Sequence, residues 1–405
     1  MEGIEFFVLD EPPNLEFLDD PEELEDIQLL LEYHQVTEKA KEKEKEENLI
    51  QVLSIPDCPA LDVIDDDDDD IVPLFNMYIQ LMGIIPSMAL ITDLLFPNDP
   101  HLRSEPRDVF LHLSRFPRLF WFMTGETPDT FRDLHVALAF AILQPRNVRL
   151  KYPIGAVRIP RGCLLSTINR LLLVFIWLRQ YPSLRCLSSL FGINITSIDD
   201  DIHHIVPILR AYFRQEIRWP TMEEFDQLRG SWPDFVNAVL AVDGTIHRVW
   251  KPLIGQREYF RGDKRCHFLL SQVCVDPHGI IRNLETGFKG HMNDMGDYNR
   301  SRLGRRELPM PAWAKVLADG GYFDDGLLVV PWTQQEAEGN ELRLQMNERH
   351  RHYRSVVERT ILVMKHYKCV SHLWKNHKWF QGTVAYLVGC LANRKIRLQQ
   401  ELRNN

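Results

Sequence analysis

Hydrophobic residues recur at helical spacing over a long part of the chain, from residue 71 to about residue 230. In PDTFRDLHVALAFAIL (128–143) and CLLSTINRLLLVFIWLRQ (163–180), apolar positions return every three or four residues, as on one face of a helix. Neither stretch shows the sustained alternation of a half-buried strand. The pattern therefore predicts an all-α domain over residues 71–230.

After residue 231 the pattern changes to short apolar runs that are typical of strands. These runs are AVLAV (238–242), HFLLSQVCVD (267–276), GIIRNLETGF (279–288), AKVLA (314–318) and LLVVP (327–331). DPHG, at 276–279, has the composition of a hairpin turn between the second and third runs. A helical pattern returns in NERHRHYRSVVERTILVMKHY (347–367). Strands mixed with helices predict an α/β sheet domain over residues 231–400.

The first 70 residues hold 25 Asp and Glu against 4 Lys and Arg, a local net charge of −21. Such a segment buries too little apolar surface to offset the entropy cost of ordering, so we expect a mostly disordered tail with one short helix at 21–35. The rest of the chain carries +11, of which +10 lies in residues 342–405. An acidic tail joined to a basic body favours a polyanion-binding surface, and a solubilising tail is the alternative.

Cysteine usage and hydropathy indicate the compartment. The seven cysteines are scattered and form no C-x-x-C pair, which favours a reducing environment. The N-terminus is acidic, unlike a secretory signal, and the longest apolar run, LLLVFIWL at 171–178, is too short to span a bilayer. We expect an intracellular soluble protein.

Three acidic residues accompany the predicted elements of the sheet domain. Asp243 directly follows the run at 238–242, Asp319 directly follows the run at 314–318, and a glycine follows each. Two neighbouring strands that end in this way would place two carboxylates side by side. Glu358 lies on or beside the apolar face of the late helix, so its side chain is expected to face the sheet.

Three converging carboxylates repel one another, so they need bound cations or raised pKa values at neutral pH. Magnesium prefers such oxygen ligands, and two ions about 4 Å apart can activate the attacking oxygen and stabilise the leaving oxygen of a phosphoryl transfer. Two plainer interpretations stay open. Each Asp-Gly pair can be a turn, and Glu358 can form an ordinary helix salt bridge with Arg354, four residues earlier.

Several motifs occur together in the second half of the chain: VDGTIHRV, GHMNDMGDYNRS, LADGGYFDDGLLVVPW and NERHRHYRSVVERTILVMK. In combination they resemble the DDE nuclease domain of PIF/Harbinger transposases and their domesticated relatives. Upstream, RCLSSLFGINITSIDDDIHHIV and RWPTMEEFDQL resemble that family's helix-turn-helix region and its approach to the first catalytic strand. The resemblance covers about residues 155–395. It implies an RNase H-like mixed sheet with Asp243, Asp319 and Glu358 at the three catalytic, metal-binding positions.

The resemblance also implies an activity, which is the cutting of DNA phosphodiester bonds by a Harbinger-type endonuclease or transposase with two Mg²⁺ or Mn²⁺ ions. Water, and later a DNA 3′-hydroxyl, would attack. It implies a separate Myb-like DNA-binding partner protein, and we expect the nucleus as the location, with the cytoplasm before import. The oligomeric state stays open, a homo-oligomer included. The rivals are a domesticated derivative that binds DNA or protein without cutting, and a hydrolase of small phosphates, which the basic C-terminal region disfavours.

Cations gather around Glu358 and are expected to contact DNA phosphates. They are Arg349, Arg351, Arg354, Arg359, Lys365 and Lys368, followed by Lys375 and Lys378. Trp374 and Trp379 could stack on unpaired bases, although core packing is the commoner use of tryptophan. The same region contains His366, Cys369, His372 and His377, whose spacing matches no standard zinc finger.

A helix-turn-helix pattern covers residues 183–210, with Gly192 at the turn and Asn194 or Thr196 as the cap of the second helix. The second helix is predicted to bury Ile195, Ile198, Ile202 and Ile205. Its opposite face presents Thr196, Ser197, Asp199, Asp200, His203 and His204, with Asp201 at the edge. Because phosphates repel aspartates, this face argues against direct reading of DNA, although Asp can accept a hydrogen bond from cytosine N4.

The charge distribution generates one prediction. A tail of −21 tethered to a body of +11 has an effective concentration of about millimolar at the basic surface, so it should compete with DNA. Deleting residues 1–70 should tighten DNA binding at low salt, and the gain should shrink above about 0.15 M salt, where the Debye length is about 8 Å. Fluorescence anisotropy across a salt series measures this. An affinity that the deletion leaves unchanged at every salt concentration would exclude competition.

Overall fold

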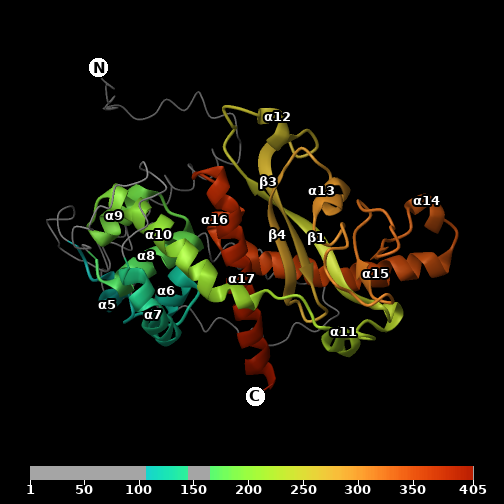
Figure 1. Ribbon diagram of the computed structural model, residues 1–405, viewed down its shortest axis with the longest axis horizontal. Coiled ribbons are helices and arrows are strands. Elements are labelled where there is room, and N and C mark those ends of the chain that lie inside the picture. Colours follow the sequence, from blue (N-terminus) through green and yellow to red (C-terminus); the bar gives the residue numbers. More distant parts are fainter. Residues whose placement is uncertain (1–105, 145–164, 405) are drawn as a thin grey trace, which may run out of the picture. The chain divides into compact units, whose positions relative to one another are not determined.

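The computed structural model describes residues 106–144 and 165–404, all within one compact unit, residues 85–405. The tail expected at 1–70 and the start of the helical domain lie outside the described residues. The described part consists of a helical region followed by a region built on a mixed β-sheet (Figure 1). This order of a helical region before a mixed sheet is the one that the hydrophobic pattern predicts. Every described helix is too short or too polar to cross a bilayer.

The helical region packs around one central apolar helix, α8. Its helices are α5 (Val109–Leu113), α6 (Pro117–Thr124), α7 (Pro128–Leu143), α8 (Thr167–Gln180), α9 (Leu184–Phe191) and α10 (Ile195–Phe213). Residues 169–179 of α8 are all buried, because α5, α6, α7, α9 and α10 each pack against it. A short link follows, made of η3 (Arg214–Glu216), α11 (Met222–Leu228) and η4 (Pro233–Phe235).

Helices α9 and α10 form the helix-turn-helix. Gly192 ends α9 with a φ of +66°, a conformation that suits glycine, and the Asn194 side chain caps α10 by accepting a hydrogen bond from Ser197 N at 2.8 Å. Ile198 and the two isoleucines that follow it on the same face, Ile202 and Ile205, are fully buried as predicted. Ile195 is 40% exposed, against prediction, because the first residue of the helix lies beyond the edge of the α8–α10 contact.

Asp201 corrects the predicted outward face of α10. It is buried, not at the edge, and its Oδ1 lies 2.8 Å from Nε and 2.7 Å from Nη2 of Arg170 on α8, which is also buried. Arg170 Nη1 donates a further bond of 2.8 Å to the carbonyl of Ile142. A buried carboxylate needs such a partner, because an isolated charge in the interior is costly. Asp201 therefore ties α10 to α8 and the end of α7.

The sheet contains β1 (Ala238–Arg248), β2 (Phe260–Arg261), β3 (Cys266–Val275), β4 (Ile281–Lys289), β5 (Lys315–Leu317) and β6 (Leu328–Val329). The strand order is β2-β3-β1-β5-β6, and β4 also pairs with β3. The β1–β3 and β3–β4 pairs are antiparallel, whereas the β1–β5 and β5–β6 pairs are parallel. The turn at 276–279 is a hairpin turn, in which Asp276 O accepts a hydrogen bond from Gly279 N at 2.9 Å.

Strand β1 is longer than the apolar run predicts. It does not end at Asp243 but continues to Arg248, because β3 pairs with it antiparallel from Ala241 to Arg248. Its parallel partner β5 accompanies it only to the Ala241–Leu317 pair. Asp243 therefore lies just beyond the end of β5 and in the middle of β1.

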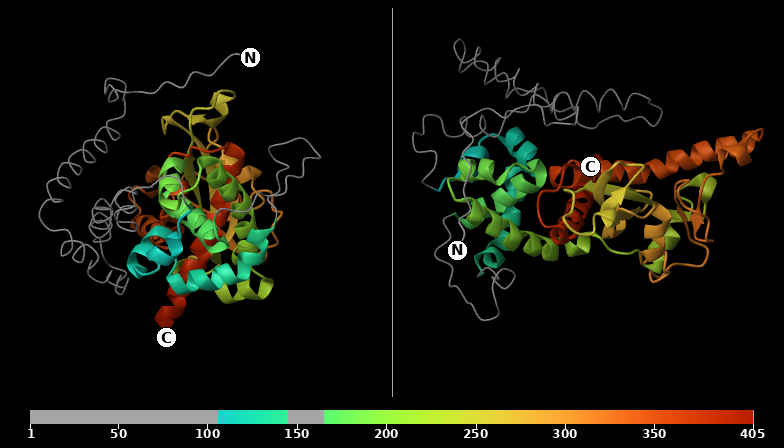
Figure 2. Two further views of the ribbon diagram at one scale, coloured as in Figure 1. Left: turned by 90° about the vertical axis from the view of Figure 1, so that its left-hand side faces the viewer. Right: turned by 90° about the horizontal axis from the view of Figure 1, so that it is seen from above.

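The helices that follow the sheet strands are α12 (Gln256–Tyr259), α13 (Asp294–Arg300), α14 (Gln334–Ala337), α15 (Glu341–Lys365), α16 (Lys368–Ser371) and α17 (Lys378–Asn404). Helix α15 packs on β1 and β3, and α17 packs on β4 and α10, so α17 joins the two regions. The opposite sheet face is covered by α11, α13 and the chain near Leu308. The first half of α15 extends beyond the sheet (Figure 2).

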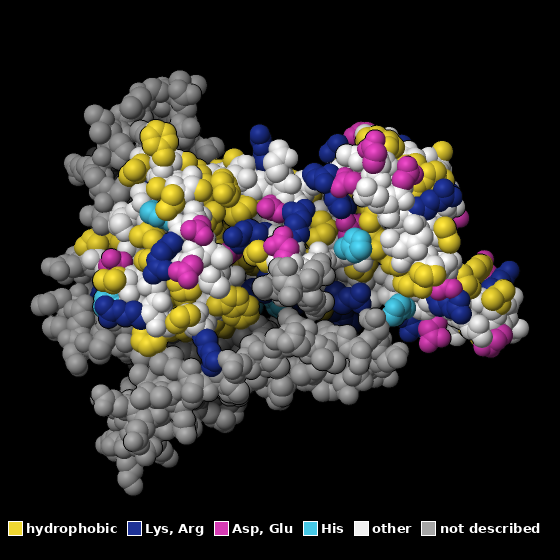
Figure 3. Space-filling model, turned by 90° about the horizontal axis from the view of Figure 1, so that it is seen from below, with side chains coloured by type: hydrophobic (Ala, Val, Ile, Leu, Met, Phe, Trp, Pro, Cys, Tyr) yellow, Lys and Arg dark blue, Asp and Glu magenta, His cyan; other side chains and the backbone are white. Residues whose placement is uncertain are grey.

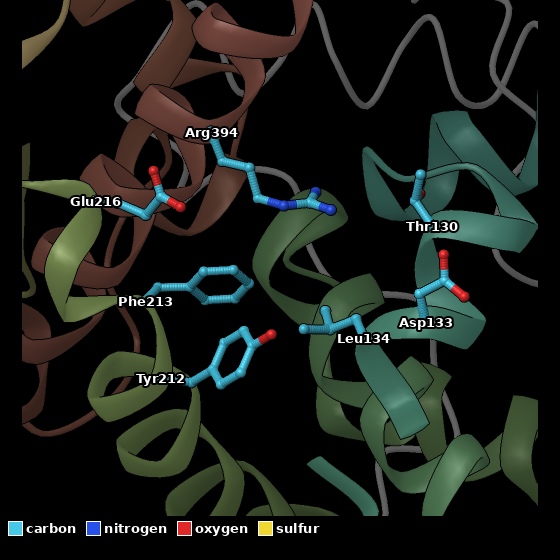
Figure 4. A pocket seen from close by; sticks show the side chains of 7 residues that line it. All are labelled: Thr130, Asp133, Leu134, Tyr212, Phe213, Glu216 and Arg394. Carbon is cyan, nitrogen blue, oxygen red and sulfur yellow. The ribbon is translucent and has the colours of Figure 1, made fainter. Parts of the chain in front are cut away.

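Charged residues strengthen the junction between the helical region and α17. Arg394 on α17 binds both carboxylate oxygens of Glu126, at 2.6 and 2.7 Å, and Arg397 forms an ion pair with Glu216. A cleft of about 370 Å³ opens beside these groups, between α7, the end of α10 and α17 (Figure 4). Arg394 and Glu216 line it, together with Thr130, Asp133, Leu134, Tyr212 and Phe213.

The burial of Asp201 generates a prediction about stability. Asp201→Asn should lower the free energy of unfolding by about 3–5 kcal/mol, because the buried Arg170 loses its charge partner. Asp226→Asn, at an exposed carboxylate on α11, should change it by less than about 0.5 kcal/mol. Urea denaturation followed by circular dichroism measures both values. Equal effects of the two substitutions would contradict the role of Asp201.

Candidate active site

Asp243 faces the side of the sheet that α15 covers. A register shift between Ala238 and Leu240 sets the alternation of β1, so that Ala241 packs on the α15 side and Val242 on the other. The Asp243 carboxylate accepts a hydrogen bond from Gly244 N at 2.7 Å and one from Arg354 Nη1 at 3.2 Å. Its side chain is 21% exposed, so it is held in the interior but open to solvent on one side.

Asp319 lies two residues beyond β5, at the same edge of the sheet. Because β5 runs parallel to β1, the ends of both strands point in one direction, and the two aspartates reach the same region. Asp319 Oδ1 accepts a hydrogen bond from Gly321 N at 2.8 Å, which shapes the loop after the strand.

Glu358 comes to this region from α15. The helix packs on β1 and β3, and Glu358 forms an ion pair with Arg354, one turn earlier on the same helix. The salt bridge that the sequence left open is therefore formed. The Glu358 side chain is half exposed, against the expectation that it faces the sheet, because it lies at the solvent side of the buried residues Val356, Val357 and Thr360.

The pKa of Asp243 depends on its burial and on the charges around it. Burial raises it most, and the charges of Asp319 and Glu358 raise it further. The Arg354 cation and the hydrogen bond from Gly244 oppose this rise, and the resulting pKa is about 6. A carboxyl group that senses both other acids shares one electrostatic environment with them. The fold thus brings together the three residues that the sequence singled out.

Arg354 supplies the positive charge of this cluster. Its guanidinium contacts Asp243 through Nη1 and Glu358 through Nη2, and its side chain is only 14% exposed. It was predicted as a DNA contact, but in this arrangement its donors bind the two acids. A single cation therefore bridges β1 and α15.

Asp294, the first residue of α13, is a fourth carboxylate in this region, and the sequence reasoning missed it. Its Oδ1 lies 3.5 Å from where a Cβ would stand on Gly244, and its Oδ2 lies 3.6 Å from where a Cβ would stand on Gly321. Asp294 therefore lies beside the two glycines that follow the catalytic candidates Asp243 and Asp319. The available signals were these glycines and the motif GHMNDMGDYNRS, which contains Asp294.

Two buried groups near Asp294, Tyr322 and Asp297, sense its charge. Tyr322 is almost fully buried, and its pKa is raised well above the usual value by burial and then by the charges of Asp243, Asp294 and Asp319. The pKa of Asp297 is raised to about 6 by burial and by the neighbouring Asp294. Negative charge therefore accumulates from β1 to α13.

These residues suit a divalent cation in chemistry, since hard ions prefer clustered carboxylate oxygens. Within the described residues, however, no group of three or more His, Cys, Asp or Glu side chains stands close enough to hold a metal. Arg354 lies between Asp243 and Glu358 and contacts both carboxylates. In this arrangement its guanidinium is their counterion.

The other predicted cations have different surroundings. Lys365 is mostly buried and donates to the carbonyls of Ile246 and Val370, so we leave it out of the proposed DNA surface. Arg349 forms an ion pair with Asp234. The remaining predicted contacts are exposed or half-buried: Arg351, Arg359 and Lys368. On the face in Figure 3, Lys and Arg side chains lie among Asp and Glu side chains instead of forming one stripe.

The two tryptophans near these cations differ. Trp374 belongs to the core, where it stacks on Tyr181 with ring centroids 5.8 Å apart, whereas Trp379 is 59% exposed. Only Trp379 remains accessible for the stacking on bases that the sequence suggested.

Comparison with known protein families matches residues 242–393 to the DDE superfamily endonuclease. Residues 163–215 match the helix-turn-helix of DDE superfamily endonuclease. The chain carries a DDE superfamily endonuclease domain of transposase type. No curated protein and no solved structure gave a match. The endonuclease match includes Asp243, Asp294, Asp319 and Glu358. The helix-turn-helix match begins at residue 163, before α8, and so starts earlier than the predicted range of 183–210.

The position of Arg354 in this endonuclease domain generates a prediction. Without metal, Arg354→Gln should lower the free energy of unfolding by about 1–3 kcal/mol, because Asp243 stays in a mostly buried place without its cation. Arg351→Gln, on the exposed face of the same helix, should cost less than about 0.5 kcal/mol. Urea unfolding in EDTA measures the difference. If both variants lose the same stability, Arg354 does not compensate the acids.

Proposed function

We propose that this protein is a Harbinger-type DNA endonuclease or transposase that cuts phosphodiester bonds by a two-metal DDE mechanism. The observation that carries the proposal is the electrostatic coupling of Asp243 to Asp319 and Glu358, three acids from two strands and a helix within the matched endonuclease domain. The cofactor is Mg²⁺ or Mn²⁺, with two ions expected, and Asp243, Asp319 and Glu358 are the proposed ligands. When bound, the ions supply activation of the attacking oxygen and stabilisation of the leaving oxygen.

The residues of the chain itself have distinct tasks in this proposal. Asp243 is held in place by Gly244 N and is kept anionic by Arg354, whose charge opposes the effect of burial on its pKa. Asp319 is fixed by its bond from Gly321 N. Tyr322 is a buried ring that senses the charges of Asp243, Asp294 and Asp319, and we assign it to limiting the access of water to the acids. Arg354 must leave at least one carboxylate when these acids bind a cation, and in this structure it is their counterion.

The proposed substrate is DNA, in keeping with the endonuclease and helix-turn-helix matches. Arg351 and Arg359 on α15 are the exposed cations nearest in sequence to Glu358, and we assign them to phosphate contacts. The half-buried aspartates at the start of α10, Asp199 and Asp200, favour a division of labour in which a separate Myb-like protein reads the sequence. We propose the nucleus as the location and leave a homo-oligomer open.

One observation favours a second function, a domesticated derivative that binds DNA or protein without cutting. Arg354 bridges Asp243 and Glu358, and an arginine that stays there would block metal binding. The two functions differ in one measurable property, which is cleavage of DNA in the presence of a divalent ion.

The nicking of supercoiled plasmid in Mg²⁺ or Mn²⁺ tests the proposal. Asp243→Asn, Asp319→Asn and Glu358→Gln should each lower the nicking rate by about 100-fold or more, because each removes charge stabilisation from the reacting centre. Glu341→Gln, an exposed acid on the same helix as Glu358, is the matched control and should cut like the wild type.

Thermal unfolding shows whether each variant is folded. If all three variants nick at a rate within tenfold of wild type, the assigned residues are refuted. A tenfold change in rate corresponds to about 1.4 kcal/mol in the barrier. Wild-type protein that binds DNA but cuts with neither ion would favour the non-cutting derivative.

A further inference from the structure

The segment between β1 and β3, residues 249–265, projects from the end of the sheet and carries α12 and β2 (Figure 1). We call this segment the arm. Its outer part exposes large apolar side chains: Trp250 is 61% exposed, Leu253 97% and Ile254 90%. Such side chains at one tip are unusual on a surface that serves no contact.

The arm also carries exposed cations. Four exposed cations lie along the arm: Lys251, Arg257, Lys264 and Arg265. Both acids of the arm are already engaged, since Glu258 pairs with Lys289 and Asp263 pairs with Arg261 at 2.9 Å. In the described part of the chain, none of the four cations has an ion pair, so the tip is apolar at its centre and positive around it.

The base of the arm is joined to the loop that carries Asp294. Arg261 donates to the carbonyl of Met292 at 3.0 Å and forms an ion pair with Asp294 at 3.5 Å. The carbonyl of Glu258 accepts from His291 N at 3.1 Å. The arm is therefore held at its base by contacts to the loop that carries Asp294, while the large apolar side chains of its tip are exposed.

The chemistry of the tip selects its partner. Exposed apolar side chains close to cations suit a polyanion with an apolar interior. Duplex DNA is such a partner. Apolar side chains can insert between its base pairs while cations bind its phosphates. A symmetric contact with a second copy would place the four cations of one arm near those of the other, which is unfavourable.

The distance to the acids also suits DNA. Trp250 lies seven residue steps along the chain from Asp243, a reach of about 23 Å at about 3.3 Å per residue. This length corresponds to about seven base pairs at 3.4 Å per step. A duplex cut at the acids can therefore reach the arm.

Resting on the proposed DNA-cutting function, we propose that the arm is a DNA wedge. Trp250, Leu253 and Ile254 enter the base stack about seven base pairs from the cut site, at 3.4 Å per step. Lys251, Arg257, Lys264 and Arg265 bind the flanking phosphates. Distortion of the duplex would then be sensed at the base of the arm, where Arg261 contacts Asp294.

The test measures binding of the full chain, in EDTA, to two 30-base-pair duplexes that differ only by two adjacent mismatches. A weakly stacked step is easier to open, so wild-type protein should bind the mismatched duplex about tenfold more tightly. The double variant Leu253→Ser with Ile254→Ser should lose this preference and keep its affinity for the paired duplex. Leu342→Ser with Leu344→Ser, at exposed apolar positions on α15, is the matched control and should keep the preference.

Removal of the cations gives a separate readout. Lys251→Ala with Arg257→Ala should weaken binding to both duplexes and lower the salt slope by about 2, about 1 for each phosphate contact. Thermal unfolding checks the folding of each variant, and the exposed positions should leave it unchanged.

The outcomes separate this inference from the proposed function. If the Leu253→Ser, Ile254→Ser variant keeps the wild-type preference for the mismatched duplex, the wedge alone is overturned. If that variant also loses a dimer that the wild type forms in sedimentation, the arm is an interface between copies of the chain. Failure of the wild type to bind either duplex overturns both proposals. Plasmid nicking by wild-type protein without any mismatch preference leaves the nuclease standing and removes the wedge.

Discussion

The bridge that Arg354 makes between Asp243 and Glu358 is the interaction on which the arrangement of the site depends. Without a cation, the fold would gather acids from β1, β5, α13 and α15 into a region where burial already raises the pKa of Asp243 to about 6. Repulsion among them would open the contact between α15 and the sheet. The guanidinium offsets this repulsion from within the same helix as Glu358, so the chain can fold around the acids before any metal binds.

The sheet sets the positions of these acids through strand length. Strand β5 is short and parallel to β1, and its last pair with β1 is Ala241–Leu317, two residues before Asp243. The chain leaves the sheet after Leu317, so Asp319 lies in the loop that follows. Strand β3 is long and antiparallel, so it holds β1 straight past Asp243 and on to the base of the arm. One strand thus carries an acid in its middle and a projecting segment at its end. Strand β1 therefore connects the proposed catalytic residue Asp243 to the proposed DNA-binding arm.

Local patterns in the sequence were sufficient for the parts that depend on neighbours along the chain. The helix-turn-helix follows from Gly192 and Asn194, and the strands follow from apolar runs. The full length of β1 could not be predicted, because the polar residues after Val242 are held in the strand by β3, not by their own propensity. The burial of Asp201 depends on Arg170, 31 residues away, and that of Lys365 on a carbonyl 119 residues away. Asp294 was missed because it meets the other acids only through tertiary structure, where it lies beside Gly244 and Gly321 from other segments.

The central claim is that the acids around Arg354 form a site for divalent ions, and a crystal structure with Mn²⁺ tests it most directly. Anomalous scattering identifies manganese without assumptions about activity. The account predicts anomalous peaks among Asp243, Asp319 and Glu358, with the Arg354 guanidinium displaced from at least one carboxylate. A structure at saturating Mn²⁺ that retains both Arg354 contacts and has no anomalous peak among these acids would contradict it.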